Sequence, residues 1–271
     1  FPNQPIGRSL LGPKNIIERI SRDEIKNFMS SHYNPKKMIV SACGKLDHDD
    51  FVEKIINSCT NLPQGTSDNR APAKYQGGEF LEKKELEQIH LILGFDGINF
   101  HDKDYYSLLV YNSLLGEGMS SKLFQEIREK RGLVYSIFSF PMSFSDSGVF
   151  GIYAGTGENQ IAELIPALCE ELKNSPITID EDEIKKGKAQ LKAGLLMARE
   201  RASNRCRTNA TQLLIHNKVI DPKEITAKID DVSIDSVKSI SSKILKTPIT
   251  LAGIGPISKL ENIDKIKNRL N

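Results

Sequence analysis

The sequence predicts an α+β fold, an α/β sandwich in which helices pack on a largely antiparallel sheet. Segments with strand-like alternation follow one another in pairs, whereas most segments with helical periodicity are grouped elsewhere in the chain. A second observation is that the closing part of the chain repeats a segment near its start. With 271 residues and 39% hydrophobic content, the chain can also bury a substantial core.

The repeat indicates that the fold is the second copy of a duplicated domain. Residues 21–44 and 233–255 share a serine, an aspartate two positions later, a helical stretch, a turn with proline and an apolar strand that ends at glycine. This interpretation implies that the front portion of the first copy is missing here. Phe1 agrees with it, because a chain that does not begin with methionine is expected to have been cut, processed or built as a part.

Three regions follow from the repeat. Residues 1–62 are expected to be the tail of a truncated N-terminal domain, and residues 79–271 the second copy. Between them, residues 63–78 are rich in proline, glycine and small polar side chains and lack apolar periodicity, which predicts a linker.

Elements in the first region are assigned from caps and periodicity. A helix is expected over residues 22–33, because Ser21 and Glu24 form a capping box before an amphipathic stretch. An apolar run predicts a strand over residues 38–43, and a second helix is expected over residues 48–58.

The second region supplies the paired strands and most of the helices. Strands are expected near residues 80–84, 88–95, 134–144, 149–155 and 249–254. Helices are expected near residues 103–115, 120–130, 159–173, 180–216 and 234–245. Thr178 and Glu181 predict a capping box for the long fourth helix, and Pro166 is expected to kink the third helix or to mark its true beginning.

The stretch GEGMSSKLFQEIREKRGLVY joins a glycine turn, an amphipathic helix and the entry to a strand. Ser120 or Ser121 can cap the helix, and Arg128 falls one turn after Phe124, at the edge of the apolar stripe. Tyr135 follows at the corner between helix and strand. A guanidinium and a phenol at one corner can both donate hydrogen bonds to a carbonyl or an oxyanion. The plainer alternative is a surface arginine and a half-buried strand tyrosine.

A wider pattern around this stretch resembles a known family. The runs QIHLILGFDG, DKDYYSLLVYNSLLGEGMSSKLFQEIREKRGLVYSIFSF and SGVFGIYAGT closely resemble the C-terminal half of the pitrilysin and mitochondrial-processing-peptidase family of zinc metallopeptidases. The similarity continues to LAGIGP, so it covers nearly the whole chain. In that family an arginine and a tyrosine seven residues apart hold the bound peptide near the zinc. Arg128 and Tyr135 match these positions, so the resemblance assigns them to substrate binding.

The resemblance also exposes an absence. The family binds zinc through an inverted motif, H-x-x-E-H, and a further glutamate, all in its N-terminal half. This chain has no H-x-x-E-H, and its five histidines are scattered: His32, His48, His90, His101 and His216. The resemblance therefore implies that this chain holds no catalytic and no metal-binding residue, and that the N-terminal domain of the full-length parent binds the zinc. No metal is expected on this chain alone.

The resulting hypothesis is the C-terminal part of a zinc-dependent endopeptidase resembling processing peptidases, in which Arg128 and Tyr135 hold the substrate. The chain alone is expected to be inactive. Its expected partners are a peptide or unfolded protein substrate and the missing N-terminal domain, with a homodimer or a heterodimer left open. The alternative is a non-catalytic partner or scaffold subunit of the same superfamily. Two departures from the family pattern are Glu117, where relatives often carry glycine, and Lys122, in place of a frequent arginine.

Composition and weak motifs argue against other classes of function. Thirty-seven basic and 35 acidic residues leave a net charge of +2, so the chain lacks the excess positive charge typical of nucleic-acid-binding proteins. A local cluster of arginines is expected to form a solvated, salt-bridged face with Glu200: Arg199, Arg201, Arg205 and Arg207. Gly116 and Gly118 imitate a nucleotide-binding loop, but they follow a helix and the third glycine is missing.

The remaining polar candidates are expected to be structural. His90 is expected to be a hydrogen-bonded strand residue, and nothing near Asp96, Asp102 and Asp104 completes a calcium or hydrolytic site. The cysteines show no C-x-x-C spacing and are expected to be small buried apolar residues: Cys43, Cys59, Cys169 and Cys206. No apolar run approaches the roughly 20 residues of a membrane span. Reduced cysteines favour a soluble protein of the cytoplasm or a matrix without excluding the periplasm, so the compartment stays unknown.

Overall fold

The computed structural model describes residues 1–62 and 71–271. The chain divides into two compact units. The first unit comprises Phe1–Pro2, Pro72–Gly194 and Lys223–Asn271, and the second comprises Asn3–Ala71 and Leu195–Pro222. Of the expected linker, residues 63–70 lie outside the described residues.

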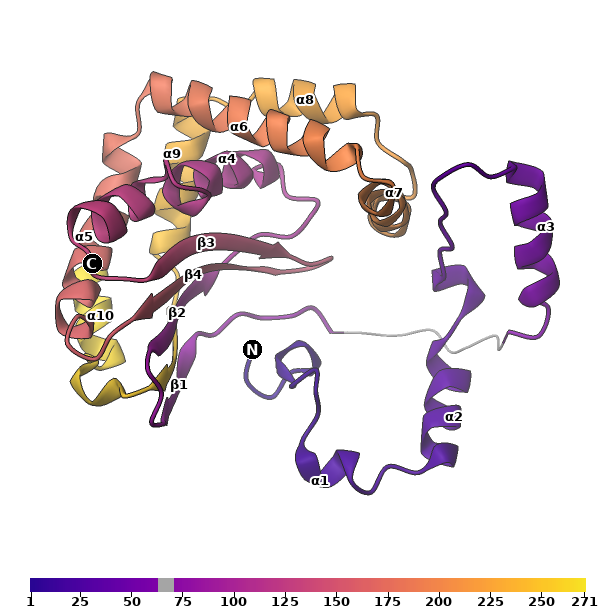
Figure 1. Ribbon diagram of the computed structural model, residues 1–271, viewed down its shortest axis with the longest axis horizontal. Helices are drawn as coiled ribbons and strands as arrows, with labels where there is room; N and C mark the ends of the chain where they lie inside the picture. The colour runs from indigo at the N-terminus through magenta and orange to yellow at the C-terminus, as the bar shows by residue number, and fades with distance from the viewer. Residues whose placement is uncertain (63–70) are drawn as a thin grey trace. The chain divides into compact units, whose positions relative to one another are not determined.

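A five-stranded sheet forms the centre of the first unit, with the strand order β1-β5-β2-β4-β3 (Figure 1). Its strands are β1 (Gly78–Lys83), β2 (Ile89–Asp96), β3 (Ser136–Ser143), β4 (Gly148–Thr156) and β5 (Thr250–Gly255). Only the β1–β5 pair is parallel, and the other three pairs are antiparallel. The largely antiparallel sheet and its five expected strands are therefore confirmed.

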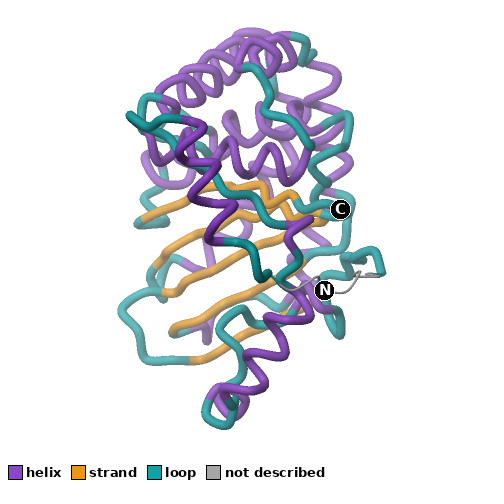
Figure 2. Tube along the Cα trace, turned by 90° about the vertical axis from the view of Figure 1, so that its right-hand side faces the viewer, coloured by secondary structure: helices purple, strands orange, loops and turns teal. Residues whose placement is uncertain are grey.

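Helices cover one side of this sheet, as Figure 2 shows for the first unit. They are α4 (Tyr105–Gly116), α5 (Ile161–Thr178), α6 (Glu181–Arg199), α8 (Pro222–Asp230), α9 (Ile234–Leu245) and α10 (Ile263–Leu270). A short 3-10 helix, η4 (Ile257–Lys259), follows β5. Since each strand alternates its side chains between two faces, one face of β2 packs into the core while His90 on the other face stays exposed.

The core of the first unit lies between the sheet and the helices. Ile89 and Leu91 of β2 are at most 1% exposed. Tyr111 of α4 is also fully buried, with its ring centroid 5.6 Å from that of Phe150 on β4. Its hydroxyl lies 2.8 Å from the Ser175 hydroxyl of α5, so the buried polar group has a partner.

Cys169 of α5 belongs to this core and confirms the expected buried, apolar character for one of the four cysteines. Burial raises the pKa of its thiol to about 11 from an ordinary value of 9.0. We expect Cys169 to resist iodoacetamide at pH 8 in the native protein, because the reactive species is the thiolate. Mass spectrometry of peptides labelled before and after unfolding checks this. Partly exposed Cys59 is the internal reference, and equal labelling of both cysteines in the native protein would contradict the prediction.

The same shift predicts how alkaline pH acts on stability. Between pH 9 and pH 11 the unfolded thiol of Cys169 ionises while the folded thiol stays protonated. Ionisation then favours the unfolded state, so the contribution of this group to folding is complete below pH 9 and is lost as pH rises toward 11.

Several expected elements differ in the structure. The expected helix over 180–216 is two helices, α6 and α7 (Ala202–His216), because Arg201 adopts an extended conformation with φ −84° and ψ 122°. The capping box of α6 is formed by Asp180 and Glu183, not by Thr178 and Glu181. Pro166 does not mark the beginning of α5, which starts five residues earlier at Ile161.

The regular elements of the second unit, where the structure describes it, are helices. This unit contains α1 (Lys14–Ile17), α2 (Arg22–His32), α3 (His48–Ser58) and α7, with 3-10 turns η1 (Pro5–Gly7) and η2 (Pro35–Lys37). The capping box of Ser21 and Glu24 at the start of α2 is confirmed, with the Glu24 carboxylate accepting from the Ser21 backbone N–H at 2.7 Å.

The expected strand over residues 38–43 is wrong, because this segment pairs with no strand among the described residues. Met38, Ile39 and Val40 are 40%, 40% and 49% exposed. An apolar run becomes a strand only when a neighbouring strand satisfies its backbone N–H and C=O groups. The corresponding segment of the repeat is β5, which lies between two strands of the sheet.

Candidate substrate-binding site

A tight turn at the end of α4 positions the candidate site. Gly116 is the last residue of α4, and a Cβ atom there would lie against the backbone nitrogen of Ser139 on β3. The helix end and the strand can approach this closely only because residue 116 has no side chain. The sheet therefore fixes where the turn begins.

Polar contacts hold the turn in place. The Ser139 hydroxyl donates to the Asn112 side-chain oxygen at 2.7 Å, which ties the end of α4 to β3. The Gln190 amide on α6 donates to the Glu117 carbonyl at 2.9 Å. Ser121 does not cap the next helix as expected, because its hydroxyl donates back to the Gly118 carbonyl at 2.7 Å. The turn is thus fastened from a strand, a helix and its own backbone.

We expect Gly116→Ala to lower the free energy of unfolding by about 1–3 kcal/mol, since the added methyl group forces α4 away from β3. The matched control is Gly194→Ala on α6, where an added Cβ meets no atom within 4 Å. Replacing a helical glycine by alanine without a clash stabilises by about 0.5–1 kcal/mol. Urea unfolding of both variants measures these opposite changes, and a neutral Gly116→Ala would contradict the packing described for the turn.

The segment after the turn is a π-helix, η3 (Phe124–Lys130), within the region expected to be an α-helix. Leu123 and Ile127 are both 0% exposed and anchor the segment to the core. Single π-helical turns occur mostly inside α-helices and frequently at functional sites. The apolar pattern correctly predicted a helix here, but it carries no signal for the wider hydrogen-bonding geometry.

Arg128 lies exposed in the last turn of η3, and its guanidinium carbon is 4.7 Å from the ring centroid of Phe124. Other cations of the segment are paired: Lys122 with Glu183 at 3.0 Å, Lys130 with Glu126 at 2.6 Å and Arg131 with Glu170 at 3.2 Å. Within residues 1–62 and 71–271, the guanidinium of Arg128 has neither a carboxylate nor a hydrogen-bond partner. Its N–H donors are therefore available to an external acceptor.

Tyr135 lies just before β3 and is 59% exposed. Its backbone N–H donates to the Gly155 carbonyl at 2.8 Å, which fixes the main chain while the side chain faces solvent. In the described part of the chain, no hydrogen bond and no ring contact joins Tyr135 to Arg128. Both side chains are therefore exposed at the connection between η3 and β3, seven residues apart in the sequence, and they do not interact with each other.

An aromatic cluster on the helix-free face of the sheet was not recognised from the sequence. The rings of Phe138 and Tyr153 stack with centroids 4.9 Å apart, and His90 Nδ1 lies 2.7 Å from the Tyr153 hydroxyl. The hydrogen-bonded character expected for His90 is confirmed. The signal was present in the alternation of β3 and β4, because strand pairing places Phe138 opposite Tyr153.

The described residues contain no group of three or more His, Cys, Asp or Glu side chains that could hold a metal ion. Those described residues therefore offer no set of ligands for the zinc of the resembling family. Asp102 accepts from the Asp104 backbone at 2.9 Å as a local turn, and burial raises the pKa of Asp96. No helix in the two described ranges is long and apolar enough to cross a membrane.

The expected solvated, salt-bridged face at the junction of α6 and α7 is confirmed as solvated, since Arg201, Arg205 and Arg207 are exposed, but its salt bridges are absent among the described residues. In the described parts of the chain, no ion pair reaches any arginine of that cluster: Arg199, Arg201, Arg205 and Arg207. The nearest acidic residue in sequence, Glu200, uses its backbone in the turn and pairs with none of them. The junction is a break between two helices, so the i, i+4 spacing that aligns side chains on one helix does not apply across it.

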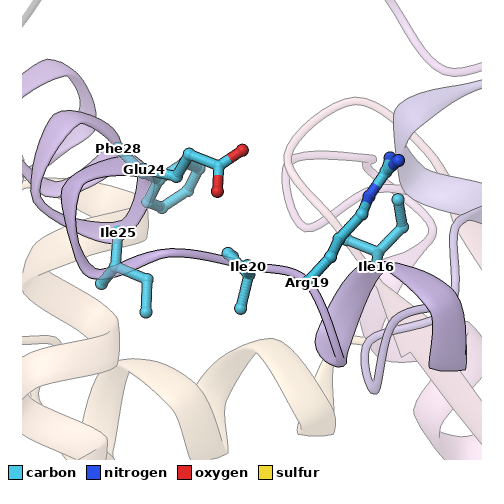
Figure 3. Close-up of a pocket in the computed structure, with 6 residues that line it drawn as sticks. All are labelled: Ile16, Arg19, Ile20, Glu24, Ile25 and Phe28. Atoms are coloured by element: carbon cyan, nitrogen blue, oxygen red, sulfur yellow. The ribbon is translucent and has the colours of Figure 1, made fainter.

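A pocket of about 580 Å³ lies in the second unit, between α1 and α2 (Figure 3). Its lining is mainly apolar: Ile16, Arg19, Ile20, Glu24, Ile25 and Phe28. Ile25 and Phe28 are 45% and 56% exposed, so α2 presents an uncovered apolar face here. The pocket contains neither Arg128 nor Tyr135.

The sequence of this chain is similar to those of a known protein family. The family model described as the Peptidase M16 inactive domain matches residues 19–191. A protein of Rickettsia bellii named "Uncharacterized zinc protease" is 34% identical over 94% of this chain and 62% of its own length. The beta subunit of the mitochondrial-processing peptidase of Lentinula edodes is 28% identical over 100% of this chain and 62% of its own length.

A solved structure shares the fold. A chain of complex III2 from Candida albicans superposes with a TM-score of 0.87, covering 100% of this chain and 67% of that chain, at 20% sequence identity. The chain described here spans about 62% of the length of the curated relatives cited above. The family match covers more than half of the chain and includes the turn, η3 and β3. The chain therefore belongs to the peptidase M16 family, the pitrilysin and mitochondrial-processing-peptidase family of zinc metallopeptidases.

Proposed function

We propose that this chain is the C-terminal part of a zinc-dependent endopeptidase and that it holds the peptide substrate through Arg128 and Tyr135. The observation that carries the proposal is the state of Arg128, the unpaired cation in a segment whose other cations described above have carboxylate partners. An exposed arginine that the fold does not use is suited to bind an external acceptor.

The chemistry fits a peptide backbone. An extended peptide presents carbonyl oxygens, and peptide hydrolysis passes through a tetrahedral intermediate whose oxygen becomes negatively charged. Arg128 offers planar N–H donors and a positive charge, and Tyr135 offers one O–H donor. Both donors lie on elements fastened to the sheet, so they are positioned before a substrate arrives.

The zinc belongs to a different part of the proposed parent protein. Since the described residues of this chain do not fit a metal site, we assign the zinc to a preceding N-terminal domain carrying H-x-x-E-H. The coding sequence upstream of Phe1 tests this assignment. An H-x-x-E-H motif followed by a glutamate supports the peptidase, and a preceding domain without it contradicts the peptidase.

The segment of residues 1–62 supports the same division of the parent. Apolar side chains of its helices are exposed, among them Ile17 at 55%, Phe28 at 56% and Ile56 at 62%. We propose residues 1–62 as the tail of the zinc-bearing domain, residues 63–78 as a linker and residues 79–271 as the C-terminal domain. The front portion of the first copy would then cover these apolar faces and pair with residues 38–43. A longer protein in which these side chains become protected from hydroxyl-radical labelling would support this division.

The second candidate is a non-catalytic role, in which the chain is part of a partner or scaffold subunit of the same superfamily. The matched family model is described as an inactive domain, and the fold neighbour is titled as a complex III assembly. The two candidates differ in one measurement on the full-length parent. Zinc-dependent cleavage of an internally quenched peptide supports the peptidase, whereas stable assembly with a partner subunit and no cleavage supports the scaffold.

A further inference from the structure

Phe124 lies one helical turn before Arg128, the arginine that the proposed function assigns to substrate binding. The guanidinium carbon of Arg128 is 4.7 Å from the centroid of the Phe124 ring, within the range of a cation–π interaction. We propose that Phe124 is a positioning residue that holds Arg128 ready for a peptide carbonyl. This inference rests on the proposed role of Arg128.

The kind of contact matters for what Arg128 can still do. A carboxylate partner would accept hydrogen bonds from the N–H groups of the guanidinium and neutralise its charge, as Glu170 does for Arg131 at 3.2 Å. The face of an aromatic ring attracts the cation from above its plane and leaves the in-plane N–H donors free. Phe124 can therefore restrict the side chain of Arg128 without competing with a substrate.

Phe124 is itself held in place. It is half-buried, and Leu123 just before η3 and Ile127 within it are 0% exposed. The Gln125 amide donates to the Met119 carbonyl at 2.7 Å, and the Gly132 backbone N–H donates to the Arg128 carbonyl at 3.1 Å. Both ends of the π-helical segment are thus fixed. A ring on this segment defines one direction for the long, otherwise unrestrained arginine side chain, which lowers the entropy lost when substrate binds.

The test is a double-mutant cycle in the full-length parent, read out as kcat/KM on an internally quenched casein-derived peptide. Phe124→Leu keeps an apolar side chain and removes the ring, and we expect kcat/KM to fall about two- to five-fold. Phe124→Trp keeps an aromatic face and is expected to stay within about two-fold of the parent. Glu129→Gln, a neighbouring exposed residue, is the matched control and is expected to be silent.

The decisive arm combines Phe124→Leu with Arg128→Ala. If Phe124 acts through Arg128, the leucine change has no further effect once the arginine is gone. An undiminished loss in the Arg128→Ala background, or a Phe124→Trp variant as impaired as Phe124→Leu, would overturn the positioning role. A parent that cleaves no peptide, or that loses less than about two-fold on Arg128→Ala, overturns the proposed function and the inference with it. Unfolding temperatures of all variants separate these outcomes from loss of folding.

Discussion

Arg128→Ala in the full-length protein is expected to lower kcat/KM for peptide cleavage by about a hundred-fold or more, the loss typical of a donor that stabilises developing charge. The reason is the state of Arg128 in the structure, exposed and without a carboxylate among the described residues. Removing it breaks no ion pair and creates no cavity, so the unfolding temperature is expected to stay within a few degrees. The measurements are steady-state kinetics on a quenched peptide and thermal unfolding followed by circular dichroism.

The control for this prediction is Arg131→Gln, three residues further along the chain. Arg131 is also exposed, but its guanidinium pairs with Glu170 at 3.2 Å and is used by the fold. Exposed pairs of this kind contribute about 0–1 kcal/mol, so the variant should lose little stability and no activity. Equal kinetic losses for both variants would mean that the net charge of the segment, not the position of Arg128, is what matters.

Tyr135→Phe extends the test to the second donor. It deletes only the hydroxyl of a side chain that is 59% exposed, so any loss of activity reports on that hydroxyl and not on packing. The division between kcat and KM then identifies the step. A rise in KM alone means that Tyr135 binds the ground-state peptide, whereas equal losses in kcat and kcat/KM mean that it acts in the transition state. Unchanged kinetics for both Arg128→Ala and Tyr135→Phe would remove the pair from the mechanism.

The strands could be predicted because their side chains alternate. The expected strand over 88–95 is β2, Ile89–Asp96, and the expected strand over 149–155 is β4, Gly148–Thr156. Each places an apolar side chain toward the helices at every second residue, and that pattern depends only on local sequence. Residues 38–43 carry a similar apolar run and form no strand. Residues 38–43 lack a partner strand among the described residues, and a local sequence pattern does not show whether such a partner is present.

The helix errors have a different cause. Nothing in MARERASN breaks a helix, since it contains no glycine and no proline, yet Arg201 is extended and separates α6 from α7. Two capping patterns also compete at the start of α6, and the structure uses Asp180 with Glu183. Both outcomes are decided by tertiary packing, which selects among local conformations of nearly equal energy.

The candidate site was predicted only in part for the same reason. Spacing placed Arg128 beside Phe124 on one helix, and the structure has that pair at 4.7 Å. The π-helical geometry of η3 and the stacking of Phe138 on Tyr153 depend on how the segment meets the sheet. The most informative fact about Arg128, its lack of a carboxylate partner, requires knowing where every acidic side chain of the described chain lies. Sequence spacing identifies near neighbours and leaves distant ones undetermined.

Residues 1–271 alone are expected to show no chelator-sensitive peptide hydrolysis, because the five histidines are scattered and no described group of three ligands can hold a metal. The measurement is cleavage of a quenched peptide with and without added zinc, and zinc-dependent turnover by this chain alone would contradict the prediction. Adding a separately expressed N-terminal part with H-x-x-E-H makes the experiment discriminating. If that part supplies the metal and this chain holds the peptide, the mixture should cleave, and a mixture made with the Arg128→Ala chain should cleave about a hundred-fold more slowly. A mixture that assembles but never cleaves favours the scaffold role, since the fold and its interface would then be intact without hydrolysis.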